Sequence, residues 1–512
     1  MKNTKWLATA ASIWIQCTCG ATFAFGIYSA ALKSSQGYDQ STLDVVSVFK
    51  DIGANIGVLS GLLYHAVTKN HNNNSQRCGF GLSTVYIVGA VHCFVGYILM
   101  WLSVIGVIYR PHVVFMCLFM FLAAQAHTFF NTANIVVALR NFPDYGGTTV
   151  GIMKGFFGLS GAILIQIYLT LFDGNSANFL LMSALFPPFM CLIFMSFVHI
   201  DPSKTTNDQR HLNNFSLIAL AIAAYLVTII ILQNIFVFPS WAHILTTVVL
   251  LILLSTPLQV ALKAQKNEQS SQSPTTTPLI LPSEAKEFES ERNDMNLLQA
   301  MSTINFWLLL VAMVCAMGSG LATNNNISQV GESLGYSTIE INTLVSLWSI
   351  WNILGRIGVG YFSDMFLHKH GCGRPLFVSL TQATMVLGHL IIGSGGNLYI
   401  GTLIVGICNG AQWSLMPTIC SEIFGVTHMG TIFNTIGAAN PIGSYIFSVL
   451  IIGSIYDKQV ETKGGGSCIG VHCFMLSFFV FAGVCLFGCL VSLVLFFRTR
   501  RFYALILQKR MM

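Results

Sequence analysis

Residues 355–364 read GRIGVGYFSD and close an apolar run at about 342–363. Gly355 and Gly360 carry no side chain, so a second helix can approach this segment closely. Asp364, at the end of the run, can cap a helix N-terminus or pair with a basic side chain. Basic residues follow it in the next stretch of sequence. We interpret these residues as the charged end of a membrane-spanning helix that packs tightly against other helices.

The composition around this motif excludes most classes of protein. The chain has 512 residues, of which 54% are hydrophobic and only 9% are charged. Soluble domains carry about 25% charged residues, so this chain could not cover a water-facing surface of its own size. It is predicted to be an all-α polytopic membrane protein.

Fourteen apolar runs are long enough to cross a bilayer, which requires about 20 residues per helix. They lie at about 6–31, 43–67, 82–108, 113–138, 147–172, 177–199, 214–235, 241–262, 303–323, 342–363, 375–394, 398–420, 430–454 and 473–497. Lys and Arg decide the orientation, because cytoplasmic segments carry an excess of both. With both termini in the cytoplasm, 19 Lys and Arg residues fall on the cytoplasmic side and four on the opposite side. An even number of spans preserves this bias.

The runs divide the chain into four predicted regions. Residues 1–200 form an N-terminal six-helix bundle, and residues 201–262 hold two additional spans. Residues 263–300 form a cytoplasmic linker, which is rich in Ser, Thr, Pro and Gln at first and is expected to be unstructured there. Residues 301–512 form a C-terminal six-helix bundle.

The two bundles share landmarks in the same order. Gly37-Tyr38 before the second span matches Gly335-Tyr336 before the tenth. Three further sets match: Gly57 and Gly61 with Gly355 and Gly360, Asn131 and Asn134 with Asn409 and Gln412, and Gly151 and Gly158 with Gly430 and Gly437. Each match alone is weak, because glycine is frequent in membrane helices. Together they indicate an internal repeat, which is common in transporters.

The motif at 355–364 resembles the inter-span signature of the major facilitator superfamily, a Gly-x-x-x-Asp pattern followed by a basic residue. Four other strings resemble its plant nodulin-like branch, the relatives of the nuclear-fusion-defective proteins. They are NFP at 141–143, GIMKG at 151–155, GLSGAI at 158–163 and YSAALK at 28–33. The resemblance covers essentially the whole chain and implies a multispan membrane transporter. The arrangement of six, two and six spans is similar to that of fourteen-span members.

Two positions depart from the family pattern in the first bundle. His65 stands where the family usually has Asp, at the counterpart of Asp364. Gly146-Gly147 stands where the family usually has Arg-Gly. Our hypothesis is that one carboxylate–arginine contact has been lost as a pair, so that the outward-open state depends more on Asp364.

The candidate site residues fall into two groups. The predicted substrate path contains Tyr28, Asn131, Asn134, Lys154, Gln166, Asn352, Asn409, Gln412, Trp413, Asn434 and Asn440. The predicted gate or coupling residues are Lys50, Asp51, His65, Arg140, Gly355, Arg356, Gly360, Asp364 and Arg374.

These residues are chosen because polar groups inside a span are costly and usually face a cavity or a partner. Asp51 is either a gate or cation-coupling carboxylate, or a member of an ion pair with Lys50. Lys154 either binds an anionic group of the substrate or extends to the lipid headgroups. The mid-span carboxamides either recognise a polar solute or hold helices together by hydrogen bonds.

The remaining features narrow the chemistry. Cys468 and Cys473 flank a glycine-rich outer loop and are a possible disulfide. The GxSxG, HExxH and P-loop signatures are absent, so we expect no enzyme activity, no cofactor and no metal site. No basic segment interleaved with aromatic residues suggests nucleic-acid binding.

The sequence thus favours a secondary active transporter that moves a small polar or organic solute by alternating access, with proton coupling left open. The alternative is a non-transporting membrane scaffold or sensor derived from a transporter fold, suggested by the altered motif of the first bundle. The expected partners are the solute, protons if transport is coupled, and the lipid bilayer; the chain is expected to be a monomer. The membrane is either the plasma membrane or an endomembrane such as that of the vacuole.

Overall fold

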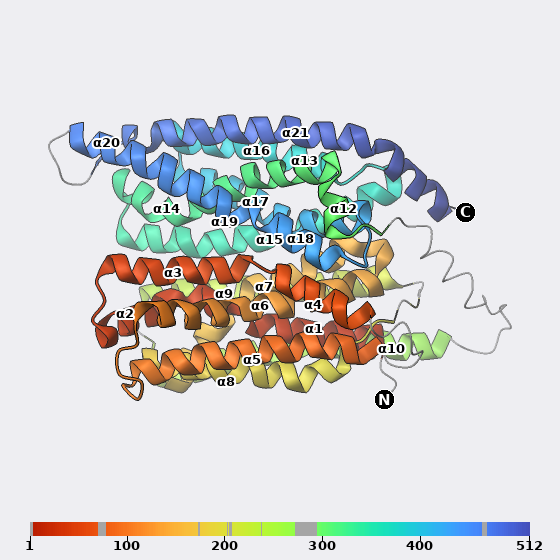
Figure 1. The fold of residues 1–512 in the computed structure, drawn as a ribbon, viewed down its shortest axis with the longest axis horizontal. Helices are drawn as coiled ribbons and strands as arrows, with labels where there is room; N and C mark the ends of the chain where they lie inside the picture. The colour runs from red at the N-terminus through yellow and green to blue at the C-terminus, as the bar shows by residue number, and fades with distance from the viewer. Residues whose placement is uncertain are drawn as a thin grey trace.

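The computed structural model describes residues 4–69, 78–172, 175–201, 203, 207–236, 238–271, 294–462 and 468–511. All regular structure in these residues is helical, and most helices lie side by side along one direction (Figure 1). Helix α1 (Lys5–Thr18) begins and helix α21 (His472–Met511) ends at the same end of the bundle. We call this the terminal end and the opposite one the distal end.

The N-terminal half occupies one side of the molecule, drawn in red to yellow in Figure 1. After α1, its helices are η1 (Gly20–Ala24), α2 (Phe25–Gln36), α3 (Gln40–Asn55), α4 (Val58–Lys69), α5 (Cys78–Val104), α6 (Val113–Asn141), η2 (Pro143–Tyr145), α7 (Gly146–Phe172), α8 (Ser176–Phe194) and η3 (Met195–Phe197). Two further helices, α9 (Asp208–Ile235) and α10 (Ser240–Ser271), pack against α1 or α7 of this half, and α9 also contacts the other half.

The C-terminal half occupies the other side, drawn in green to blue (Figure 1). Before α21, its helices are α12 (Leu297–Met301), α13 (Ile304–Met313), the π-helix η4 (Val314–Gly318), α14 (Ser319–Ser333), α15 (Thr338–His370), α16 (Pro375–Gly393), α17 (Leu398–Ile423), α18 (Met429–Gly437), α19 (Ala439–Ser444), the π-helix η5 (Tyr445–Gly453) and α20 (Ser454–Thr462).

Thirteen helical segments of the described residues are long and apolar enough to cross a membrane. The predicted tenth span is the exception, because the corresponding helix α15 is not among these segments; polar residues lower its hydropathy, and Glu340, Arg356, Asp364 and Lys369 are charged. With 33 residues, α15 is still about 50 Å long at 1.5 Å per residue. The polytopic all-α prediction is therefore confirmed, with about thirteen candidate spans rather than the expected fourteen.

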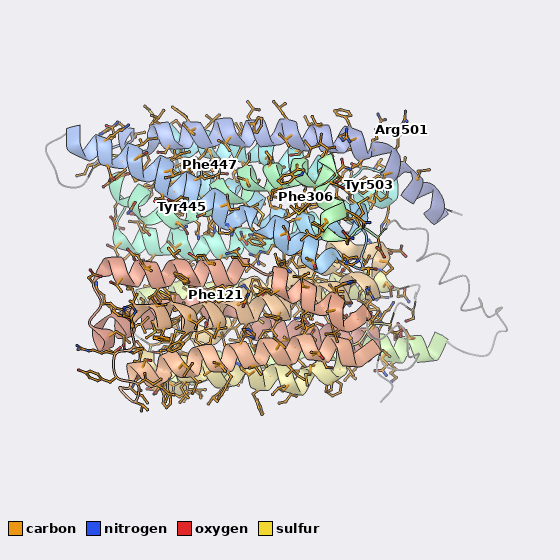
Figure 2. All side chains as sticks on the ribbon, in the orientation of Figure 1. Phe121, Phe306, Tyr445, Phe447, Arg501 and Tyr503 are labelled. Carbon is orange, nitrogen blue, oxygen red and sulfur yellow. A yellow bond between two sulfur atoms is a disulfide. The ribbon has the colours of Figure 1, made fainter. Side chains whose placement is uncertain are left out.

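The outside of the bundle is apolar, as a lipid-facing surface requires. Large hydrophobic side chains project from it, such as Phe487 and Leu490 of α21, which are 56% and 55% exposed. Figure 2 shows such side chains along the outer faces of both halves. Polar and charged side chains are instead sorted to the helix ends and to the interior.

The predicted linker is shorter than the sequence suggested. Helix α10 continues to Ser271, nine residues past the predicted end of its span at 262. The Trp6 indole N–H donates to Glu268 at 2.6 Å, which ties this extension to the first helix. Residues 272–293, most of the predicted linker, lie outside the described residues.

Candidate functional site

Two helix pairs related by the internal repeat, α7 with α15 and α4 with α18, are among the contacts through which the halves meet. In the first pair, a Cβ atom at Gly360 would lie 2.3 Å from the carbonyl oxygen of Gly147. In the second, a Cβ atom at Gly61 would lie 2.3 Å from the backbone nitrogen of Thr431. Such distances leave no room for any side chain, so glycine allows the backbones to touch. The two contacts are equivalent under the internal repeat.

The same repeat explains the residues that surround these contacts. Gly151 on α7 faces the carbonyl of Arg356, and its counterpart Gly430 on α18 lies beside Gly61. Gly355 is different, because its Cβ position would strike the carbonyl of Ile407 on α17 within its own half. The predicted gate residue Gly355 therefore packs the C-terminal half internally, whereas Gly360 closes the contact between halves.

Asp364 joins the halves at the terminal end. Its carboxylate accepts hydrogen bonds from the backbone N–H of Gly147 at 3.0 Å and of Thr148 at 2.6 Å, and from the Thr148 hydroxyl at 2.6 Å. These N–H groups belong to the first turn of α7, where a helix leaves donors unsatisfied and carries partial positive charge. The carboxylate thus caps a helix of the opposite half.

Arg374 holds this carboxylate in place. Its Nη2 lies 2.6 Å from Asp364 Oδ1 and its Nε lies 2.8 Å from Glu422 Oε1. Burial would lower the pKa of Arg374, but the charges of Glu422 and Asp364 outweigh it and raise the pKa. Tyr503 of α21, labelled in Figure 2, donates its hydroxyl to Glu422 at 2.9 Å. We call Asp364, Arg374, Glu422 and Tyr503, with Thr148, the Asp364 cluster.

The corresponding contact of the first half is made by two histidines. His65 near the end of α4 faces His428, the residue that precedes α18, with ring centroids 3.9 Å apart and planes inclined by 39°. His428 stands at the N-terminus of α18 as Gly147 and Thr148 stand at that of α7. In this contact His65 therefore stands where Asp364 stands in the Asp364 cluster, and His428 stands where Gly147 and Thr148 begin α7.

The second family departure, Gly146, lies apart from this pair, and the predicted gate residue Arg140 lies near Tyr64. Gly146 faces Leu139 and Thr418, next to Gly147 in the Asp364 cluster, and not His65. The geometry therefore places the two family departures at different contacts between the halves. Arg140 lies 6.0 Å from the ring of Tyr64, and its Nε is buried without a hydrogen-bond partner.

Halfway along the bundle, both halves contribute side chains to one cluster. Lys154 of α7 lies with its Nζ 5.1 Å from the ring of Trp413, and Arg356 of α15 lies with its Cζ 6.0 Å from the same ring. Arg356 Nη1 donates to the backbone carbonyl of Lys154 at 2.6 Å. The sequence left open whether Arg356 or Arg374 pairs with Asp364; the structure shows Arg374.

Two predicted carboxamides also join the halves. Asn434 of α18 donates to the Thr132 hydroxyl at 2.8 Å and lies 3.4 Å from the Ser60 hydroxyl, both in the N-terminal half. Asn440 lies 3.4 Å from the side-chain oxygen of Asn55. The hydrogen bonds that join the halves through Asp364, Arg356, Asn434 and Asn440 lie between the terminal end and the middle of the bundle.

Four predicted path residues bond within the N-terminal half or to the additional helices. Gln166 donates to Thr246 of α10 at 2.8 Å, so it fixes an additional helix to α7. Asn134 accepts from the Tyr86 hydroxyl at 2.6 Å, and Asn131 lies 3.4 Å from Gln16. Tyr28 is fully buried among aromatic rings. For these residues the geometry favours helix packing, the alternative that the sequence left open.

Three predicted residues of the C-terminal half pack against their own helices. Gln412 donates to Thr381 of α16 at 2.5 Å. Asn409 lies against Gly320 of α14, and its amide oxygen is buried without a partner. Asn352 is partly buried and faces Gly410 through its backbone. None of the three reaches across to the N-terminal half through a hydrogen bond among the described residues.

Lys50 and Asp51 pair with each other at 3.2 Å. The Asp51 side chain is 59% exposed, whereas the Lys50 amine lies 5.0 Å from the ring of Phe25. Of the two alternatives that the sequence left open for Asp51, the geometry shows the ion pair with Lys50, and it does not place either group in the central cluster.

At the distal end, Cys468 and Cys473 form a disulfide, with His472 beside it.

Sequence reasoning missed Thr148, Glu422, Tyr503 and His428. Thr148 follows the Gly147 landmark, and a hydroxyl at a helix start is a recognisable capping signal. Glu422 is a carboxylate at the end of an apolar run, close to the positively biased side. His428 has no such signal, because a single histidine near a span end is unremarkable in a sequence.

Two family profiles cover most of the chain. The family described as Nodulin-like matches residues 5–262, and the one described as NFD4, C-terminal domain, matches residues 292–505. Protein NUCLEAR FUSION DEFECTIVE 4 of Arabidopsis thaliana is 26% identical over 98% of this chain and 89% of that protein. The riboflavin transporter MCH5 of Saccharomyces cerevisiae is 26% identical, but over only 32% of this chain and 34% of its own length.

Solved structures share the fold at low sequence identity. The proton:xylose symporter XylE of the major facilitator superfamily superimposes with a TM-score of 0.56, covering 95% of this chain and 94% of the other, at 12% identity. The fucose:proton symporter FucP of E. coli gives a TM-score of 0.50 over 95% and 98%, at 13% identity. These similarities establish the arrangement of helices and nothing about substrate.

Proposed function

This chain belongs to the nodulin-like family and has the major facilitator fold, and from that premise we propose that it is a secondary active transporter of a small polar or organic solute. It is an integral multi-pass membrane protein of a transporter family. In this proposal, residues 1–200 and 301–512 act as two six-helix bundles that rock against each other. Residues 201–262 and 263–300 add two spans and a linker, and α15 completes fourteen spans.

The contact between the halves carries the proposal. Hydrogen bonds between the halves run from Asp364 at the terminal end to Asn440 halfway along. In an alternating-access transporter with one gate closed, we expect the two halves to be bonded to each other at that gate. The excess of Lys and Arg supports a cytoplasmic terminal end. The gate closed here is then the cytoplasmic one, and the solute enters from the distal side.

Several properties follow from the relatives rather than from this geometry. Two solved relatives are described as proton symporters, and this supports proton coupling for this chain. The Arabidopsis relative supports a plant origin. We propose the plasma membrane or an endomembrane such as the vacuolar one, a monomeric state, and no enzymatic activity.

Counterflow into proteoliposomes tests transport. Proteoliposomes that contain the purified protein would be loaded with one unlabelled metabolite at a time, from a panel of neutral, anionic and cationic compounds. The uptake of the same compound in labelled form would then be followed with and without a pH gradient. We expect saturable counterflow for one chemical class. If no metabolite exchanges and the protein holds one conformation, the chain is a scaffold or sensor instead.

A further inference from the structure

The centre of the interface contains two buried cations. The residues Lys154 and Arg356 are 2% and 8% exposed, and they come from opposite halves of the molecule. They share the ring of Trp413, which lies 5.1 Å from the lysine nitrogen and 6.0 Å from the guanidinium carbon. The rings of Phe157 and Phe433 lie 5.8 Å and 5.9 Å from the same lysine nitrogen. The surroundings are thus aromatic and enclosed.

Neither cation has a carboxylate partner among the described residues. The ion pairs there join Lys5 to Asp208, Lys50 to Asp51, and Arg374 to Asp364 and Glu422. Asp364 is already occupied by Arg374 and the start of α7. Two basic side chains therefore lie in the membrane interior without a carboxylate partner among the described residues.

Such an arrangement is costly unless an anion completes it. An unpaired charge in a low-dielectric interior costs several kcal/mol after relaxation. A buried lysine can release its proton, but a guanidinium stays charged. Cation–π contacts with Trp413 offset part of this cost. The Nε of Arg356 is also buried without an acceptor, which leaves an N–H donor for a ligand.

Lipid contact and helix packing each account for only part of this geometry. A lysine that extends to the headgroups would expose its amine, whereas Lys154 is buried between aromatic rings of both halves. A purely structural role for Arg356 accounts for one donor, Nη1, bonded to the Lys154 carbonyl. It does not account for the second cation or for Nε.

We propose that Lys154 and Arg356 bind the carboxylate of an organic anion, which is the transported solute. Arg356 offers planar N–H donors that match a carboxylate, and Lys154 adds a point charge from the other half. Because each half supplies one cation, the anion holds the halves together in the occluded state. The role as transported solute rests on the proposed function, but the binding itself does not.

Binding can be tested without transport. The melting temperature of the full chain would be measured in nanodiscs of neutral phosphatidylcholine. The added ligands would be monocarboxylates and dicarboxylates of graded size, their neutral amides, and chloride or inorganic phosphate. We expect at least one carboxylate to raise the melting temperature while its amide does not. Lys154→Met and Arg356→Gln should each weaken the binding of that carboxylate at least tenfold. Arg356→Lys should retain part of the affinity that Arg356→Gln loses.

The ligand-free protein supplies a second readout. If the two cations await an anion, Lys154→Met should melt at the same or a higher temperature than the wild type without ligand, because it removes an uncompensated charge. A packing role predicts a lower temperature. The exposed Lys263→Met and Arg500→Gln are matched controls, and they should leave the carboxylate affinity unchanged.

The outcomes separate the two proposals. Carboxylate binding that depends on Lys154 and Arg356, without counterflow, supports this site and contradicts the transport function. Counterflow of neutral solutes only, unchanged by Lys154→Met, overturns this site and leaves the transport function standing. Equal stabilisation by chloride or phosphate, or stabilisation only in nanodiscs with anionic lipid, also overturns a carboxylate solute.

Discussion

The two halves of this molecule meet at the terminal end through contacts that occupy equivalent positions but differ in chemistry. In the Asp364 cluster, one carboxylate accepts three hydrogen bonds from the start of α7 and pairs with Arg374. At the equivalent place, His65 faces His428 with ring centroids 3.9 Å apart. The glycine contacts beside them are alike, because Gly360 and Gly61 both touch backbone of the opposite half. Close packing is thus retained in both contacts, while a carboxylate that pairs with an arginine is shown in only one.

This difference shows which parts of the repeat the closed gate requires. Glycine at the crossing is required sterically in both contacts, since no side chain fits there. The carboxylate is not required sterically, and a histidine ring occupies its place in the other contact. We therefore expect most of the polar stabilisation of the closed terminal end to come from the Asp364 cluster.

The largest effect is expected from Asp364→Asn. The substitution leaves Arg374 buried with one carboxylate fewer and weakens the cap of α7. Breaking a buried pair in this way costs roughly 3–5 kcal/mol. We expect a clear fall in melting temperature and about tenfold slower counterflow. His65→Gln is the matched change in the other contact, and equal effects of the two variants would refute the asymmetry.

Adding one methyl group at a helix crossing should be nearly as disruptive in either half. Gly360→Ala and Gly61→Ala each place a Cβ atom about 2.3 Å from opposing backbone, so the halves must separate at the terminal end. We expect roughly 1–3 kcal/mol of destabilisation for each. Cysteine-accessibility labelling at the terminal end should rise in both.

A control for this pair lies on the same helix. A Cβ atom at Gly358 would meet nothing within 4 Å, so Gly358→Ala should be neutral or slightly stabilising. If Gly358→Ala opened the terminal end as much as Gly360→Ala, the contact between backbones would not be the cause.

A smaller effect is expected when the first contact is given a carboxylate. His65→Asp places a negative charge near the N-terminus of α18, which is worth about 0.3–1 kcal/mol. We expect the closed terminal end to be favoured and turnover to slow a few-fold. The double variant His65→Asp plus Gly146→Arg tests whether a pair was lost, and an unchanged conformational equilibrium and transport rate would reject that hypothesis.

The smallest effect concerns two helix starts at the distal end where the halves resemble each other. Hydrogen bonds from the Thr42 hydroxyl and backbone N–H lower the pKa of Asp39, and those from the Ser337 N–H and hydroxyl lower the pKa of Glu340. A lowered folded pKa stabilises the helix start above the unfolded pKa, and this is lost as pH falls through the folded value. Amide protection factors at the starts of α3 and α15, corrected for the intrinsic exchange rate at each pH, should therefore fall in acid. Asp39→Asn and Glu340→Gln should remove this pH dependence at their own helix only, since both keep a capping acceptor.

The sequence was informative wherever hydrophobicity or glycine alone decides the outcome. Most span positions and the crossing glycines Gly61 and Gly360 could be predicted, because each depends on residue types in a fixed pattern. The breaks inside spans could not be predicted. The second predicted span, for example, is divided between α3 and α4 around Ile56 and Gly57. A hydropathy pattern contains no information on such interruptions.

The candidate site was predicted less completely, because its partners are distant in sequence. Lys154 could be selected as an intramembrane charge and Arg356 as a residue of the glycine-rich motif, but their shared ring at Trp413 depends on how the halves dock. Gln166 was selected by the same rule and instead holds α10. A polar residue in a span is equally consistent with a ligand and with a neighbouring helix until the packing is known.

Alternating access is the central claim, and a distance measurement in the membrane tests it most directly. Spin labels at the exposed Ala66 and Phe366 report on the terminal end, and labels at the exposed Val48 and Val345 report on the distal end. We predict that transported solute shifts both distance distributions in opposite senses, one lengthening as the other shortens. If both distance distributions stay unchanged on addition of every solute that the protein exchanges or binds, the account is contradicted.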